Sequence, residues 1–145
     1  MQTLDEIRYT VYRLGKIINA PSSLLSLPDI SRGDGTPHIE ILGEEYHYVS
    51  SERGIENDRK QTFNIDELLY WIFSDVTSSM SYSYELSHRV LNQDFRRLAF
   101  SKKLDLLGTL SEDWSQRESK KIEDTLRCNP YDDDIDKRVS LCRSY

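Results

Sequence analysis

The apolar residues at the start of the chain recur at helical spacing. This set comprises Leu4, Ile7, Val11, Leu14 and Ile18. Thr3 can cap the first turn, and Glu6 stands three residues later, where a capping box requires an acid or amide. The spacing therefore predicts a helix from about Thr3 to Ile18 with one face toward the core. Residues 20–37 are rich in Pro, Gly and Ser, which predicts a connecting segment.

The pattern then changes to a period of two. Residues 38–42 alternate between apolar and polar, residues 43–45 have turn composition, and residues 46–50 alternate again. This predicts an antiparallel hairpin. Because an isolated hairpin is marginally stable, it needs support from helices or from a third strand. Residues 52–62 are expected to form either that strand or a structured loop.

Helical spacing returns in the second half of the chain. Asn64 can cap a helix from about Ile65 to Met80, and the serines at 78, 79 and 81 predict its end. Further helices are predicted over 84–90, 94–107 and 112–127, with Gly108 as a stop signal. The whole pattern predicts an α+β fold: an N-terminal helix, a small antiparallel sheet and a C-terminal helical bundle. Residues 1–134 are expected to form one domain, and residues 135–145 a charged, weakly ordered tail.

Charge and composition narrow the function classes. The chain has 145 residues and a net charge of −6, without a basic cluster of the kind that binds nucleic acid. It has no apolar run long enough to span a membrane and no secretory signal at the N terminus. Cys128 and Cys142 are therefore expected to be reduced thiols in a cytoplasmic protein. An acidic protein of this kind favours a basic partner.

The candidates for catalysis are few. Glu85-x-x-His88 is half of a di-iron signature, but the second copy of this spacing, Glu44-x-x-His47, falls on the predicted hairpin. We therefore predict no metal site, and the three scattered histidines leave little for acid–base catalysis. The alternative is a hydrolase or a metal-binding protein that uses Glu85, His88 and Asp94.

Charged residues in the two halves of the chain predict a polar network. Arg53 and Arg59 are expected to pair with acids of the helical half, such as Asp75, Glu85 or Asp94. Adjacent residues on a helix point about 100° apart, so one of the two arginines in Asp94-Phe95-Arg96-Arg97 should pair with an internal acid while the other reaches solvent or a partner. The predicted structural network comprises Arg53, Arg59, Asp75, Glu85, His88, Arg89, Asp94 and Arg96.

Other residues are candidates for contact with a partner. Tyr70 and Trp71 lie off the apolar stripe of their helix, so they either pack against the hairpin or form an exposed aromatic anchor. The acids of the hairpin region suit a basic partner. The predicted contact residues are Glu44, Glu45, Glu52, Glu56, Tyr70, Trp71 and Arg97.

Several ordered motifs carry a resemblance to a known family. They are Glu52-Arg53-Gly54-x-Glu56-x-x-Arg59, the run from Glu67 to Thr77, Tyr84-Glu85-Leu86-x-His88-Arg89, Asp94-Phe95-Arg96-Arg97-x-x-Phe100, Leu106-Leu107-Gly108, Trp114 and Pro130-x-Asp132-Asp133. Together, over roughly Pro37 to Asp133, they resemble the immunity-protein-63 family of bacterial polymorphic toxin systems. The resemblance implies a small cytoplasmic protein that binds and neutralises a cognate toxin domain, without catalysis or cofactor. The alternative is a generic protein-interaction or regulatory module.

Overall fold

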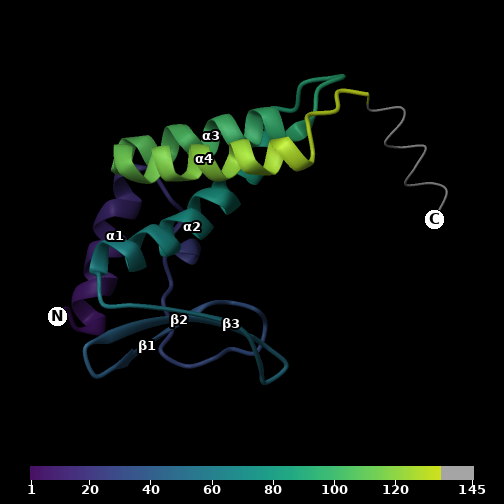
Figure 1. The fold of residues 1–145 in the computed structure, drawn as a ribbon. Coiled ribbons are helices and arrows are strands. Elements are labelled where there is room, and N and C mark those ends of the chain that lie inside the picture. Colours follow the sequence, from purple (N-terminus) through teal and green to yellow (C-terminus); the bar gives the residue numbers. More distant parts are fainter. Residues whose placement is uncertain (135–145) are drawn as a thin grey trace. The chain divides into compact units, whose positions relative to one another are not determined.

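The computed structural model describes residues 1–134, and helices precede and follow a small sheet in the order of the chain. The elements are α1 (Leu4–Ile17), a short 3-10 helix η1 (Ser22–Leu24), β1 (His38–Leu42), β2 (Glu45–Glu52), β3 (Ile55–Thr62), α2 (Ile65–Ser87), α3 (Phe95–Leu110) and α4 (Glu112–Cys128) (Figure 1). The predicted α+β class is therefore confirmed. The predicted tail, residues 135–145, lies outside the described residues.

The chain divides into two compact units. The first comprises residues 1–76, and the second begins at Thr77, so α2 contributes to both. The prediction of one domain over residues 1–134 stays a prediction. No helix within residues 1–134 combines the length and the apolar character needed to cross a membrane.

In the first unit, α1 begins and ends close to the predicted limits. Thr3 caps it, since its Oγ1 accepts a hydrogen bond from the Glu6 N–H at 3.2 Å. Near its other end, Gly15 leaves space for Leu25, because a Cβ at Gly15 would lie 2.5 Å from the Leu25 Cδ1. The buried stripe of the helix includes Ile7, Val11 and Ile18.

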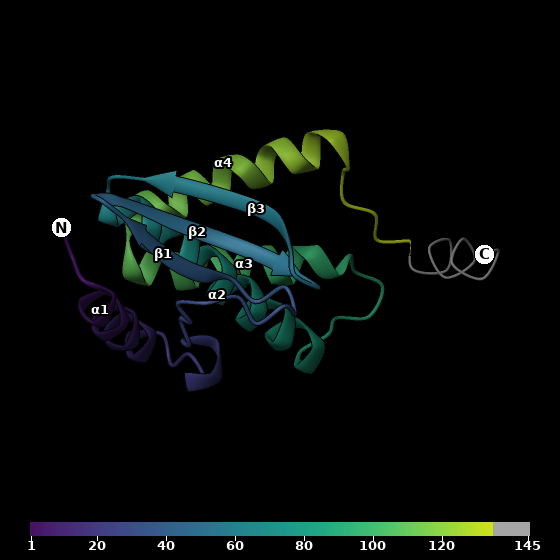
Figure 2. The same ribbon diagram turned by 90° about the horizontal axis from the view of Figure 1, so that it is seen from below.

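The sheet has the order β1-β2-β3, with both neighbouring pairs antiparallel (Figure 2). The segment predicted as strand or loop is therefore a strand. Arg53 and Gly54 form the β2–β3 turn with φ of 52° and 78°. Two successive positive φ angles are the geometry of a tight hairpin turn whose twist matches the strands.

One face of the sheet is tied to the helices of the same unit through two tyrosines of β2. The Tyr48 hydroxyl donates to the Asp75 carboxylate at 2.6 Å, and the Tyr46 hydroxyl accepts from the Gln2 N–H at 2.8 Å. Both tyrosines are buried. The sheet thus contributes aromatic packing and two long-range hydrogen bonds to the first unit.

The predicted break in the second helix is wrong, because α2 is one continuous helix of 23 residues. The small hydroxyl side chains do not interrupt it. Thr77 and Ser81 are buried within it, and the Ser87 hydroxyl donates to the Ser83 carbonyl at 3.2 Å. Such a bond keeps the hydroxyl group occupied without breaking the helix.

Gly108 does not stop α3, which continues to Leu110. A glycine inside a helix costs only about 1 kcal/mol relative to alanine, which packing can offset. The helix ends at Ser111, whose N–H donates to the Leu107 carbonyl and whose Oγ accepts from the Trp114 N–H as the cap of α4. The helices α3 and α4 then run side by side (Figure 1), joined by an ion pair of 2.8 Å between Lys103 and Glu118.

Replacing Tyr48 by Phe should lower the free energy of unfolding by about 1 kcal/mol at pH 7, because the hydrogen bond to Asp75 is lost. Burial, together with the charge of Asp75, raises the pKa of the Tyr48 hydroxyl. The folded state therefore keeps this proton. The contribution of the protonated Tyr48 hydroxyl to the free energy of unfolding is lost as the pH rises above about 10, where tyrosines of the unfolded chain ionise.

Urea unfolding between pH 7 and 11 measures both effects. The difference between wild type and Tyr48→Phe should shrink at high pH. Tyr9→Phe, at an exposed position, is the control and should change stability by less than about 0.5 kcal/mol. Equal effects of the two substitutions would contradict the assignment.

Candidate functional site

Arg59 is the centre of a polar cluster that joins all three strands. Its guanidinium donates to the Glu40 carboxylate at 2.9 Å, to the His47 Nδ1 at 2.8 Å and to the Glu56 carboxylate at 2.8 Å. We call Glu40, Glu45, His47, Glu56 and Arg59 the Arg59 cluster. One donor group thus fixes side chains from β1, β2 and β3.

The hydrogen bonds determine the form of His47. Because a guanidinium can only donate, the His47 Nδ1 must accept. The proton of the neutral ring therefore lies on Nε2, which is 2.8 Å from the Glu45 carboxylate. At the other end of the cluster, the His38 Nε2 lies 3.1 Å from Glu40.

The carboxyl group of Glu40 is held in its ionised form. Burial by itself raises its pKa, but the hydrogen bonds from His38 and Arg59 outweigh burial, and the net pKa is lowered. The cluster therefore carries a fixed negative charge on β1 opposite a fixed positive charge on β3.

The prediction that Arg59 pairs with acids of the helical half is wrong. In the register of the sheet, Arg59 lies opposite Val49, on the face away from Tyr48 and its partner Asp75. Arg53 occupies the exposed β2–β3 turn and makes no ion pair within residues 1–134. The expected single network is not observed among the described residues: Asp75 bonds Tyr48, Glu85 bonds Arg89, and Asp94 bonds Arg96.

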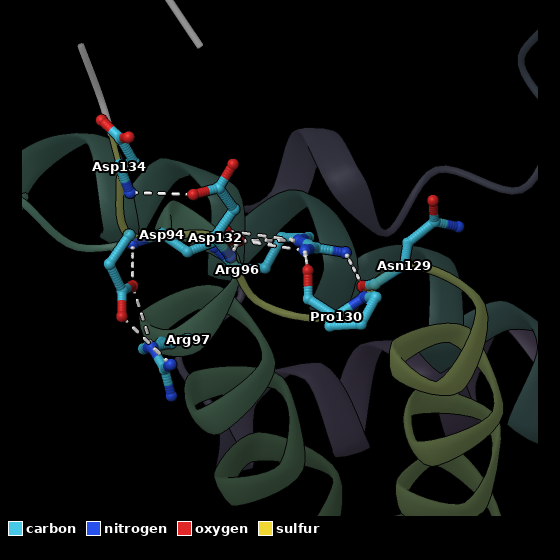
Figure 3. A network of polar contacts seen from close by, with 8 residues as sticks. Asp94, Arg96, Arg97, Asn129, Pro130, Asp132 and Asp134 are labelled. Carbon is cyan, nitrogen blue, oxygen red and sulfur yellow. Dashed lines mark hydrogen bonds and ion pairs between the residues drawn. The ribbon is translucent and has the colours of Figure 1, made fainter. Parts of the chain in front are cut away.

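The network of the second unit is built on Asp94, whose side chain is 1% exposed (Figure 3). Asp94 caps α3 by accepting from the Arg96 N–H at 2.9 Å, and its carboxylate also receives the Arg96 guanidinium at 3.0 Å. Arg96 continues to the carbonyl groups of Asn129 and Pro130, each at 2.9 Å. The Asp132 N–H closes the network by donating to Asp94 at 2.9 Å.

Arg97 holds the same C-terminal segment from a second side. It forms two hydrogen bonds with the Asp133 carboxylate, at 3.0 and 3.1 Å, and its guanidinium lies 4.2 Å from the centre of the Tyr131 ring. Asp133 also accepts from the Asp94 N–H at 2.7 Å. We call Asp94, Arg96, Arg97 and residues 129–134 the Asp94 clamp. It ties the segment after α4 to the start of α3.

The clamp sets the ionisation of Asp94. Burial raises the pKa of this carboxyl group, but the hydrogen bonds from the Arg96 side chain, the Asp132 N–H and the Arg96 N–H dominate. The pKa of Asp94 is consequently far below its usual range. As helix geometry predicts for the adjacent arginines, Arg96 pairs with this internal acid, whereas Arg97 is half-exposed.

The three residues of the catalytic alternative are engaged separately. Glu85 is buried and bound by the Arg89 guanidinium at 3.0 and 3.1 Å, while Asp94 is bound by Arg96. His88 stacks on Tyr84, with its Nδ1 3.0 Å from the Tyr84 carbonyl oxygen. Among residues 1–134, no three His, Cys, Asp or Glu side chains are grouped to hold a metal ion.

The predicted contact residues occupy different environments. Tyr70 is fully buried, so it packs in the core and is removed from the contact set. Trp71 is half-buried, with the Lys60 ammonium 5.8 Å from its ring centre. Glu44 and Glu45 lie at the start of β2 and Glu52 at its end, which separates them by about 23 Å at 3.3 Å per residue. Glu56 lies on β3 beside Arg59.

Sequence reasoning missed several members of these networks. Glu40 and His47 lie on strands whose side chains alternate between two faces, and only the register of the sheet shows that they meet Arg59. The sequence gives one sign that the segment after α4 is important, the motif Pro130-x-Asp132-Asp133. The motif does not reveal that Tyr131 and the carbonyl groups of Asn129 and Pro130 contact the arginines of α3.

A family model described as Immunity protein 63 matches residues 43–124, which is more than half of the chain. The chain belongs to the Immunity protein 63 family. The match covers β2, β3, α2, α3 and most of α4, whereas α1, β1 and the C-terminal part of the Asp94 clamp lie outside it. The family model thus matches fewer residues than the motif resemblance, which extends from about Pro37 to Asp133. No curated protein and no solved structure matches the chain significantly.

Replacing Asp94 by Asn should lower the free energy of unfolding by about 2 kcal/mol at pH 7, because the partly buried Arg96 guanidinium loses its charged partner. Because the pKa of Asp94 is lower in the folded state, its ionisation stabilises the fold above about pH 4, the pKa of an aspartate in the unfolded chain. This contribution to stability is lost as the pH falls toward the pKa of Asp94 in the folded state. The deficit of Asp94→Asn should therefore shrink between pH 7 and pH 3.

Denaturant unfolding across this pH range measures the deficit. Asp124→Asn is the matched control, since Asp124 forms an exposed ion pair with Arg127 on α4 and should contribute less than about 0.5 kcal/mol. A deficit that is independent of pH, or equal in the two variants, would refute the role given to Asp94.

Proposed function

We propose that this protein binds a cognate bacterial toxin domain in the cytoplasm of the producing cell and neutralises it. The match to the Immunity protein 63 model is the observation that carries this proposal. The proposal includes neither catalysis nor a cofactor. The partner is a protein, and protection follows from occupying its surface.

The Arg59 cluster suits a protein that acts by binding. Tight binding requires side chains that are already ordered, because ordering them on association costs free energy. In the cluster, one guanidinium and the intervening His47 hold carboxylates from three strands in place. The sheet therefore presents a polar surface whose geometry exists before the toxin arrives.

The acidic residues proposed to contact the toxin are spread along the sheet and do not form one compact cluster. Glu44 and Glu52 stand at opposite ends of β2, and both are exposed. An interface of standard size covers about 800 Å² on each partner, which is wide enough to include both ends. We therefore propose that the toxin covers the strands from the β1–β2 turn to the β2–β3 turn.

Charge gives the expected character of the toxin surface. With a net charge of −6 and acids at both ends of β2, the protein suits a basic partner, such as a nuclease domain that carries its own phosphate-binding surface. Complementary charge accelerates association more than it strengthens the final complex. Trp71 and Arg97 remain candidates for direct contact.

Co-expression with the C-terminal domain of the toxin encoded beside this gene tests the proposal. Growth should be restored, and the two proteins should elute as one complex in size-exclusion chromatography. A generic interaction module would give neither result. Unrelieved toxicity together with separate elution would refute immunity to this toxin.

Reversing all four acids, Glu44, Glu45, Glu52 and Glu56, to Lys should reduce the association rate with the toxin domain by at least about tenfold at low salt. Since Glu45 and Glu56 also hold the Arg59 cluster, the pair Glu44→Lys with Glu52→Lys isolates the effect of charge. Stopped-flow association at several salt concentrations measures both variants.

The matched control is the pair Glu123→Lys and Asp124→Lys on the exposed face of α4. It changes the net charge by the same amount as the pair Glu44→Lys and Glu52→Lys. Its association rate should stay within about twofold of wild type at low salt, because the reversed charges are not part of the proposed contact surface. If reversal of the four sheet acids leaves affinity and protection unchanged, the acidic surface is not the docking surface.

A further inference from the structure

Large apolar side chains are exposed where α2 ends and α3 begins. Their exposed fractions are 45% for Tyr82, 68% for Leu86, 47% for Val90, 82% for Leu91 and 40% for Phe95. We call these five residues the corner patch. Single exposed apolar residues are normal on a protein surface, but a group of five within fourteen positions of one corner marks an interaction site.

The corner patch spans the end of α2, the connecting residues Val90 and Leu91, and the start of α3. Tyr82 and Leu86 are one helical turn apart on α2, and the Tyr82 ring lies 6.1 Å from the ring of Phe95. Phe95 is the first residue of α3, directly after Asp94 at the centre of the Asp94 clamp. The buried network therefore fixes the backbone on both sides of Phe95, at one edge of the patch.

Charged side chains border the corner patch. Glu85 is buried, whereas its partner Arg89 is 59% exposed. Asp94 is buried, and the side chain of its partner Arg96 is 19% exposed. Arg97 is 43% exposed and is paired with Asp133, which is 45% exposed. Although the chain as a whole is acidic, this corner offers apolar side chains beside the exposed guanidinium group of Arg89.

We propose that the corner patch is the apolar anchor of the toxin complex and receives a toxin segment with apolar side chains flanked by carboxylates. This inference rests on the proposed function and adds a second, chemically different surface to it. All five patch residues lie inside residues 43–124, the part that matches the family model. The apolar core of an interface supplies most of its binding energy, whereas charged residues act mainly on encounter.

The two surfaces should therefore control different rate constants. Loss of the acids on the sheet should slow association, whereas loss of the corner patch should accelerate dissociation of the formed complex. Most differences in affinity between variants of one interface arise from the dissociation rate.

The test uses the full chain and the C-terminal domain of the toxin encoded beside its gene. Leu86→Ala combined with Leu91→Ala should raise the dissociation rate at least about tenfold and change the association rate by less than about twofold. Ile17→Ala combined with Ile30→Ala is the matched control, because these isoleucines are 54% and 72% exposed elsewhere on the chain. The control should leave both rates unchanged, and both variants should melt within a few degrees of wild type.

A second pair of variants tests the charge of the occupant. Leu91→Glu should raise the dissociation rate more than Leu91→Lys does, because a carboxylate at the patch repels the carboxylates of the proposed toxin segment. Equal effects of Glu and Lys, or a larger effect of Lys, would overturn the acidic character of the occupant.

The remaining outcomes separate the two proposals. If wild type binds the toxin domain and protects, but the double alanine variant dissociates at the same rate, the corner patch is not the anchor and the proposed function stands. If wild type itself does not bind the toxin domain, both proposals fall. If the patch variant loses a homodimer seen by sedimentation while its toxin binding is unchanged, the occupant is a second copy of this chain.

Discussion

The alternation of side chains along β2 is the constraint on which the first unit depends. Tyr46 and Tyr48 point to the face that bonds Gln2 and Asp75, while His47 and Val49 point to the opposite face, which also carries Arg59. A shift of the register by one residue would place the tyrosines among the charged groups and His47 in the core. The packing of the unit and the polar cluster proposed to meet the toxin are therefore set together.

The second unit depends on one buried carboxylate. Asp94 caps α3, binds Arg96 and accepts a hydrogen bond from the Asp132 N–H, so its side chain connects the start of α3 to the segment after α4. A partly satisfied buried network would cost stability, but here the carboxylate is bonded by both backbone and side-chain donors. In consequence, the corner that exposes Leu91 and Phe95 has a defined geometry.

Much of the fold follows from the sequence, because periodicity and capping are local signals. The Thr3 and Ser111 caps, the alternation in β1 and β2 and the apolar stripe of α2 all identify elements that the structure confirms. The serines of α2 misled the prediction because propensity is a weak guide where a residue is buried, as Ser81 is. The partners of Arg59 could not be predicted, because they depend on which residues lie opposite one another across three strands.

The contact surface was the least predictable feature. Tyr70 and Trp71 are adjacent aromatic residues with the same sequence signal, yet one is fully buried and the other half-exposed. Leu86 and Leu91 have the residue type of a core, and the motif that contains Leu86 gives no sign that this side chain is exposed. Only their exposure in the folded chain distinguishes them from packing residues.

Hydrogen–deuterium exchange of the protein, alone and in the presence of the proposed cognate toxin domain, tests the central claim most directly. The account predicts slower exchange on binding in residues 43–62 and in residues 86–95, because the sheet and the corner patch are covered. No slowing anywhere, or slowing confined to α1 and α4, would contradict it.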